Sequence, residues 1–380
     1  MAMATRGAGN RKAIVSSRAR VSIIWALGAF VVLQLFYHFP LTQWHPQLHD
    51  AEYGQKLAGL RTHLHKNPKP TPFIVGIGSS LISMGLRPDA LTACQPENPA
   101  GPLVYNFGMN GTRSIVQLLC LQRLLADGIR PDWVLIEIYP RFYFGTDKKA
   151  HFPTVRLQQQ DFPVVDRYFE EPREIRSDWR KGQCLPWFYH RNCLQNLFLP
   201  GWVPADKRLH GDWQNTDEWG WICRPDVIQS LKRNYRTPQY VKNIAETNAW
   251  YNQQDVIKEI DGALREMLSI CQREKIGVVL LRMPESSYLR NGYSSAMNDR
   301  IDRWLASLGQ DAGVSVVSAL DWLADDEFAD GIHADLQGAV KFTRRLESEV
   351  IRHLRPGQTQ PTPPTLVSSL TVRNRPVPMP

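Results

Sequence analysis

Cysteine is scarce in this sequence, and the spacings that build common metal sites are missing. The 380 residues include six cysteines, too few for the disulfide framework of a small secreted domain. No CxxC or CxxH pair occurs, so there is no sign of a structural zinc site, and we expect neither a metal nor a cofactor. Cys120 and Cys271 fall within apolar helical patterns and are expected to be buried thiols. A bridge among Cys184, Cys193 and Cys223 remains open.

Acidic residues are missing from the first twenty positions. The basic residues there are Arg6, Arg11, Lys12, Arg18 and Arg20. The net charge of the chain is +8, from 45 basic and 37 acidic residues, and these five together with Arg373 and Arg375 account for most of it. The middle of the chain is therefore almost neutral, which argues against a basic groove for nucleic acid.

Residues 21–39 contain no Asp, Glu, Lys or Arg. As a helix this segment is roughly 28 Å long, about one hydrocarbon core. Basic residues precede it and aromatic residues follow it, so the positive-inside rule places residues 1–20 in the cytoplasm. We expect a single-pass protein of the cytoplasmic membrane with its main domain on the extracytoplasmic, periplasmic side. A cleavable signal peptide is the alternative, but no small-x-small cleavage site follows the apolar run.

The rest of the chain divides by composition, and its 43% apolar residues exclude disorder throughout. Residues 40–71 are polar and predict a stalk, 72–355 a folded domain, and 356–380, with seven of the 27 prolines, a disordered tail. Residues 141–253 are too long for a connection and predict an insertion that serves as a lid or substrate-binding rim. Its tryptophans, which suit sugar stacking or simple core packing, are Trp179, Trp187, Trp202, Trp213, Trp219 and Trp221.

Short β-branched runs alternate with amphipathic patterns in the folded domain. The predicted strands are 72–78, 103–107, 133–139, 277–283 and 314–319, and the predicted helices are 112–126, 254–274, 295–308 and 337–353. Alternation of this kind predicts an α/β fold with a mostly parallel five-stranded sheet covered on both faces. In such a sheet, ligands bind at the carboxyl ends of the strands.

The first predicted strand leads into Ser80, within the sequence Gly-Ser-Ser-Leu. A serine at a strand-to-helix turn can expose a nucleophile whose own amide binds an oxyanion. The alternative is a helix cap. Gly76 and Gly78 lack the third glycine of a dinucleotide fingerprint, and Ile82 stands where the GxSxG elbow of α/β-hydrolases has its last glycine. Both of those motifs are therefore excluded.

Two further segments have residues suited to acyl transfer. The second strand leads into Asn106 and Gly111, and Gly111 is expected to open the following helix and offer its amide to negative charge. Asp330 and His333 form a DxxH turn ahead of the last helix, which can supply a general base and the carboxylate that orients it. The alternatives are a glycine-rich loop capped by Thr112 and a capping aspartate beside a surface histidine.

The three segments, in this order, resemble the SGNH (GDSL-type) hydrolase superfamily over residues 72–354, apart from the insertion. The resemblance implies a flavodoxin-like three-layer α/β/α fold. It also implies that Ser80 is the nucleophile, His333 the base and Asp330 the orienting carboxylate. The amides of Ser80 and Gly111 would form the oxyanion hole.

One segment departs from the family pattern. Members usually have a GxND segment after the third strand, whose Asn donates to the oxyanion, but this chain has Glu-Ile-Tyr-Pro-Arg at 137–141. Loss of one such donor can cost on the order of 100-fold in rate. An alternative for Arg282 and Glu285 is a mutual ion pair. The residues expected near the substrate are Asn106, Asn110, Tyr139, Arg141, Arg282 and Glu285.

The membrane tether, the Gly-Ser-Ser form and the altered third segment are similar to the acyltransferase branch of the superfamily. That branch includes the extracytoplasmic proteins of alginate O-acetylation and teichoic acid D-alanylation, which act beside a multi-pass membrane-bound O-acyltransferase. The resemblance implies transfer of an acyl group, expected to be acetyl, through a serine ester to a hydroxyl of a cell-surface polysaccharide. A carbohydrate esterase that uses water and a non-catalytic glycan-binding or scaffold protein are the alternatives. His63 and His65 have a metal-like spacing but are expected to lie in the solvated stalk.

Overall fold

The computed structural model describes residues 7–39, 49–68, 70–92, 101–146, 152–203, 215–222 and 224–359. These residues form two compact units. The smaller unit holds the described residues up to 51, together with 154–157 and 173–203. The larger unit holds the rest of the described chain, including every strand of the sheet.

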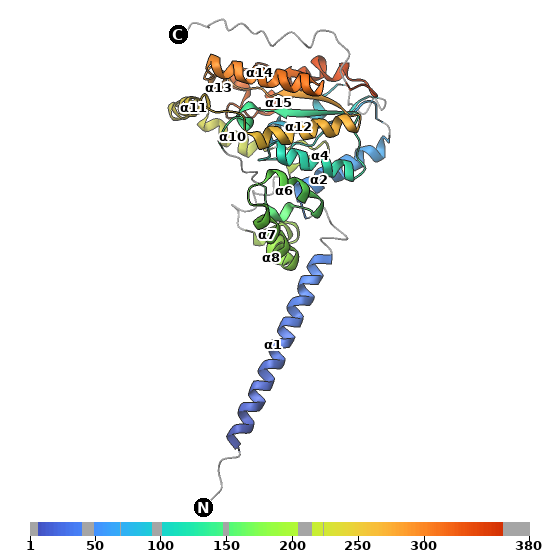
Figure 1. Cartoon of the computed structure of the whole chain (residues 1–380), viewed down its shortest axis with the longest axis vertical. Helices are drawn as coiled ribbons and strands as arrows, with labels where there is room; N and C mark the ends of the chain where they lie inside the picture. Colours follow the sequence, from blue (N-terminus) through green and yellow to red (C-terminus); the bar gives the residue numbers. More distant parts are fainter. Residues whose placement is uncertain are drawn as a thin grey trace, which may run out of the picture. The chain divides into compact units, whose positions relative to one another are not determined.

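The smaller unit contains the N-terminal helix α1 (Gly7–Phe39), which Figure 1 shows as one uninterrupted helix. Its segment Ala19–Tyr37 has a mean hydropathy of 1.9 and is not buried, so it is long and apolar enough to cross a membrane. The unit also contains η4 (Thr154–Arg156), α7 (Pro172–Cys184), α8 (Pro186–Phe198) and η6 (Pro200–Trp202).

The larger unit is built on a parallel sheet with the strand order β2-β1-β3-β4-β5. Its strands are β1 (Phe73–Ile77), β2 (Leu103–Asn106), β3 (Trp133–Ile138), β4 (Gly277–Arg282) and β5 (Ser315–Ser318). All five predicted strands and the parallel arrangement are confirmed. This is the flavodoxin-like strand order, in which the chain changes direction across the sheet next to β1 and ligands bind at the carboxyl ends there.

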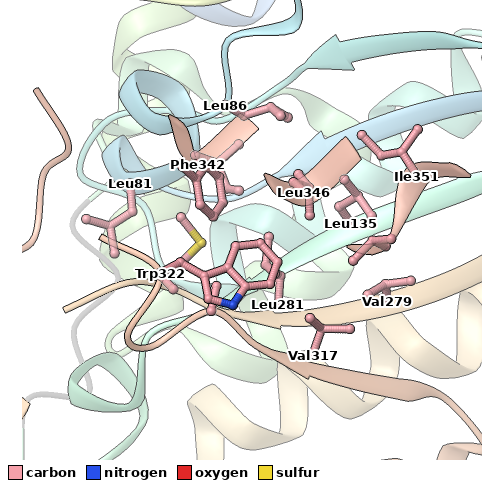
Figure 2. Close-up of a cluster of buried hydrophobic side chains, with 14 of the residues drawn as sticks. Leu81, Leu86, Leu135, Val279, Leu281, Val317, Trp322, Phe342, Leu346 and Ile351 are labelled. Atoms are coloured by element: carbon pink, nitrogen blue, oxygen red, sulfur yellow. The ribbon is translucent and has the colours of Figure 1, made fainter. Parts of the chain in front are cut away.

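Helices cover both faces of the sheet. Those of the larger unit are α2 (Ala51–Lys66), α3 (Ser80–Gly85), η3 (Pro88–Ala90), α4 (Ser114–Ala126), α5 (Pro140–Tyr143), η5 (Gln159–Asp161), α6 (Phe162–Tyr168), α10 (Pro225–Asn234), α11 (Pro238–Tyr251), α12 (Lys258–Arg273), α13 (Ser287–Arg290), α14 (Ser295–Ala312), η8 (Asp325–Glu327), α15 (Leu336–Glu349) and η9 (Ile351–His353). On one face, Leu135, Val279 and Leu281 of the strands pack against Phe342 and Leu346 of α15 (Figure 2). Helices α4, α12 and α14 contact the strands but contribute nothing to that cluster, so they cover the other face.

Helix α2 differs from the predicted stalk over 40–71. Leu57 and Leu60 are buried on α2, and the larger unit begins with this helix rather than at residue 72. Lys56 and Glu52 are buried on the same face, so the apolar periodicity that marks a packed helix is interrupted by charge. Residues 40–48 of the predicted stalk lie outside the described part of the chain.

Helix α2 and residues 215–222 together cover the outer edge of β2. The amide of Asn106 donates to the carbonyl oxygen of Trp219 at 3.0 Å. The Nζ of Lys56 donates to the carbonyl oxygen of Asn106 at 3.4 Å and to that of Gly220. Burial lowers the pKa of Lys56 to about 8. The ammonium group therefore satisfies one carbonyl group at the end of the edge strand and one in residues 215–222.

The predicted insertion at 141–253 is not one body. Helices α7 and α8 belong to the smaller unit, whereas α10 and α11 belong to the larger unit. Trp221 is buried and donates to the carbonyl oxygen of Met84 at 2.7 Å, so it is a packing residue. Trp202 is 77% exposed. Trp213 and most of the predicted tail, from residue 360 onward, lie outside the described residues.

Candidate active site

The turn after β1 presents Ser80 as the first residue of α3. The cap of this helix is Ser79, whose hydroxyl accepts from the amide of Leu81 at 3.2 Å. Ser79 is fully buried, whereas Ser80 is half-buried. The capping alternative therefore applies to Ser79, and the hydroxyl of Ser80 is left for another partner.

The hydroxyl of Ser80 lies 2.8 Å from Nε2 of His333. On the other side of the ring, Nδ1 of His333 lies 2.8 Å from Oδ2 of Asp330. The structure thus brings together three side chains that come from opposite ends of the sequence. A nucleophile bonded to a base that is oriented by a carboxylate is the arrangement that activates a serine.

Asp330 is held by its own turn. Its Oδ1 accepts from the amides of Ile332 at 3.2 Å and His333 at 2.9 Å. Burial opposes ionisation, but the hydrogen bonds and charge of His333 outweigh it and hold the pKa of Asp330 below its usual value. The helix cap is a different residue, Asp335, which accepts from the first amides of α15. The capping alternative therefore does not describe Asp330.

Gly331, between the two DxxH residues, has a φ of +94°. A Cβ added there would lie 2.4 Å from the hydroxyl of Tyr240 and 2.8 Å from that of Ser286. The hydroxyl of Tyr240 in turn donates to the carbonyl oxygen of Asp330 at 2.7 Å. Helix α11 thus contacts and supports the DxxH turn, which the sequence pattern did not indicate.

Gly331→Ala should reduce the free energy of unfolding by about 2–4 kcal/mol, because left-handed strain adds to a steric clash. Gly357→Ala is the matched control, since Gly357 has a φ of +74° and open space around its Cβ position; its cost should be about 1 kcal/mol. Urea unfolding of both variants measures the difference. Equal losses would show that the contact with Tyr240 is unimportant.

The loop after β2 is hydrogen-bonded to Gly78, in the turn after β1 that presents Ser80. Gly78 accepts at its carbonyl oxygen from the amide of Met109 at 2.8 Å and from the hydroxyl of Thr112 at 3.2 Å. Gly111 is exposed, with a φ of +69°. Helix α4 begins at Ser114 with Arg113 as its cap, so the expectation that Gly111 opens the helix, or that Thr112 caps it, is wrong.

Two of the residues predicted near the substrate have structural roles in this loop. Asn106 is fully buried, and its amide group donates to the carbonyl oxygens of Ile82 at 2.8 Å and Leu86 at 2.6 Å. It therefore holds α3 in place and has no surface for a substrate. The backbone amide of Asn110 donates to Glu52 at 2.8 Å.

The residues at and after the ends of β3 and β4 form a largely buried polar network rather than an exposed surface for a substrate. Arg141 donates to the hydroxyl of Tyr293 at 3.0 Å, and Tyr293 donates to Glu285. Glu285 is fully buried, which raises its pKa, and Tyr139 is also buried. Arg282 is buried and pairs with Asp302 at 3.5 Å, so the alternative of an Arg282–Glu285 ion pair is not found.

Glu137, near the end of β3, lies against the turn that presents Ser80, a position that no motif of the sequence indicated. Its Oε2 accepts from the amides of Ser79 at 2.8 Å and Ile82 at 3.2 Å, and its Oε1 from the hydroxyl of Ser79 at 2.7 Å. Burial raises the pKa of Glu137 to about 7. The one indication in the sequence was that Glu137 is a single acidic residue within the apolar run Trp133–Ile138.

Among the described residues, no group of three or more His, Cys, Asp or Glu is placed to hold a metal. His63 instead bonds to the carbonyl oxygen of Glu218 at 3.0 Å and stacks on Trp219 at 4.1 Å. Cys120 and Cys271 are buried as expected, and Cys184 is exposed. Cys184 is a free thiol, and the side chains of Cys193 and Cys223 lie outside the described part, so a bridge between those two stays open.

Comparison with known proteins gave weak likenesses only. No family model and no curated protein matches the chain. A solved structure from Bacteroides fragilis, described provisionally as an acylhydrolase, is 11% identical and covers 78% of this chain and 97% of its own, with a TM-score of 0.33. A provisionally described GDSL-like lipase from Parabacteroides merdae is 14% identical and covers 72% and 93%, with a TM-score of 0.30. Likenesses at this level show neither the family nor the function of this chain.

Proposed function

We propose that this protein is a serine-dependent acyl-transfer enzyme of the SGNH type, anchored to the membrane by α1. The observation that carries the proposal is the continuous hydrogen-bonded series from Ser80 through His333 to Asp330, with 2.8 Å at each of its two side-chain contacts. A helix cap, a buried polar network or a surface histidine would not require the hydroxyl of Ser80 to face Nε2.

In the first step, Nε2 of His333 takes the proton from Ser80 as Oγ attacks the carbonyl carbon of an acyl donor. The carbonyl oxygen becomes an oxyanion, for which the amides of Ser80 and Gly111 are the proposed donors. His333 then gives its proton to the departing oxygen, the bond to the leaving group breaks, and an acyl ester remains on Ser80. Asp330 holds the ring and stabilises the imidazolium.

In the second step, an acceptor hydroxyl attacks the acyl-serine ester. His333 removes the proton of that hydroxyl and returns it to Oγ, so Ser80 is regenerated. With a sugar hydroxyl as acceptor the reaction is O-acylation of a glycan, and with water it is hydrolysis. We propose the glycan, with acetyl as the acyl group and a multi-pass membrane O-acyltransferase as its source.

An aromatic wall beside the catalytic turn supports a sugar acceptor. Tyr235 and Tyr240, from the predicted insertion, and Tyr288 of α13 are half-buried and contact one another with ring centroids 5.2–6.4 Å apart. Tyr240 touches Asp330 directly. Aromatic side chains with one exposed side suit the apolar faces of a sugar ring.

The test uses the full chain in detergent with p-nitrophenyl acetate as donor. We expect mass spectrometry to find one acetyl group on the peptide that contains Ser80, and an added oligosaccharide to accelerate its loss and become acetylated. Release of acetate at a rate indifferent to the oligosaccharide would replace the transferase with an esterase. Absence of acetyl-Ser80, together with no labelling by a fluorophosphonate, would leave a non-catalytic protein.

A further inference from the structure

The turn that presents Ser80 is hydrogen-bonded to one carboxylate, that of Glu137 on β3. Glu137 accepts three hydrogen bonds, and all three come from the four residues Ser79–Ile82. Its side chain is 1% exposed, and a Cβ on Gly78 would lie 2.5 Å from its Oε2. The contact between the end of β3 and this turn is therefore close enough to require glycine at position 78.

These bonds decide which amide of the turn is left for a ligand. The amides of Ser79 and Ile82 donate to Glu137, and the amide of Leu81 donates to the hydroxyl of Ser79. Within the described chain, the amide of Ser80 has no acceptor. Of the four consecutive donors, the one left over is that of the nucleophile itself, where an oxyanion would form.

We propose that Glu137 is a positioning residue for Ser80: its ionised carboxylate fixes the turn, occupies the competing amides and leaves the amide of Ser80 free for the oxyanion. This inference rests on the proposed acyl-transfer function. In the SGNH superfamily, which the sequence resembles, the segment after the third strand supplies a donor to the oxyanion. Here Glu137 of the third strand supplies an acceptor that binds the turn before α3. The end of β3 thus contributes to the site through Ser80 rather than by touching the substrate.

Protonation of Glu137 is also expected to make the reaction rate depend on pH. Burial raises its pKa to about 7, against the hydrogen bonds from Ser79 and Ile82 and the charge of His333, which lower it. Among the described residues, the buried Tyr143 of α5 also interacts with Glu137, since burial and the charge of Glu137 together raise the pKa of that tyrosine. Protonation of Glu137 places a donor where the amides need an acceptor, so the turn should loosen as the pH falls below about 7.

The test compares the rate at which a fluorophosphonate labels Ser80 in full-length wild type and Glu137→Gln between pH 5 and 9. The variant keeps one carbonyl oxygen and the shape of the side chain but has no charge. We expect its labelling at pH 8 to be slower by about 100-fold, as for a misplaced reacting atom. The slope of the logarithmic rate at acid pH should be shallower in the variant than in wild type, because glutamine cannot gain the proton that Glu137 gains.

The matched control is Glu347→Gln. Glu347 is a buried carboxylate of α15 that accepts from the amide of Thr92 at 3.1 Å and its hydroxyl at 2.7 Å, the same kind of bonding away from Ser80. It should lose stability but keep the labelling rate and the slope. If Glu137→Gln does not fold by circular dichroism, Ser79→Ala decides, and a loss of about tenfold or more is then expected.

The outcomes separate the two proposals. Wild type that resists the probe, or Ser80→Ala that is labelled equally well, contradicts the acyl-transfer function itself. The positioning role alone is overturned if wild type reacts at Ser80 and the folded Glu137→Gln variant reacts at the same rate with the same slope. The same conclusion follows if Ser79→Ala, tested in its place, labels at the wild-type rate.

Discussion

Ser80→Ala should abolish turnover of p-nitrophenyl acetate, with a loss in kcat of at least about 10⁴-fold. The hydroxyl is the group that His333 faces at 2.8 Å, and without it no acyl ester can form. The fold should be kept, because the hydroxyl of Ser79, rather than that of Ser80, caps α3. The measurement is initial rate together with mass spectrometry of the peptide that contains residue 80.

Ser83→Ala is the matched control for this variant. Ser83 lies on the same helix and is fully buried, and its hydroxyl makes no hydrogen bond to the described residues. Its activity should stay within about threefold of wild type, since a buried hydroxyl without a partner contributes little. Comparable losses in both variants would mean that α3 is simply sensitive to substitution, and the nucleophile assignment would fall.

Asp330→Asn should lower kcat by up to about 10⁴-fold at neutral pH, as expected when the orienting carboxylate of such a site is neutralised. The amide can no longer accept from Nδ1 with a full charge, so the ring is free to hold its proton on the nitrogen that faces Ser80. Asp335→Asn is the control, because asparagine also caps a helix and Asp335 caps α15. A control variant as inactive as Asp330→Asn would contradict the assignment.

Asp330 should also make the free energy of unfolding depend on pH. The pKa of Asp330 lies below its usual value of 3.8 in the folded protein, since the bonds and charge of His333 outweigh burial. Its contribution to folding is therefore present above that value and is lost as the pH falls through the lowered pKa. Asp330→Asn should be less stable than wild type at pH 7, and the difference should shrink in acid.

The sheet was predictable because burial on both faces leaves an unmistakable pattern. Strands such as 133–138 and 277–282 are apolar runs bounded by turn residues, and their alternation with helices fixes a parallel sheet. Helix α2 was not predicted, because the charged residues Lys56 and Glu52 occupy buried positions on it. Pairing of charged groups with carbonyl oxygens and amides, which no periodicity records, makes that burial tolerable.

The candidate site was predictable to the extent that it follows chain order. Ser80, Asp330 and His333 stand in short motifs at strand ends, so the sequence indicated them, and the structure places their side chains in contact. Glu137 and Tyr240 act through neighbours that are distant in the chain. Only the register between β1 and β3 brings Glu137 behind the nucleophile.

The covering of β2 by α2 and residues 215–222 bears on how the protein behaves among copies of itself. An uncovered outer strand presents a row of free amides and carbonyls to which a strand of another molecule can add. Here the amide of Asn106 is bonded to Trp219, and the carbonyl oxygen of Asn106 to Lys56. A lysine buried at that border also makes intrusion by an apolar strand costly. The backbone groups at this end of β2 are thereby occupied and are not available to a strand of another molecule.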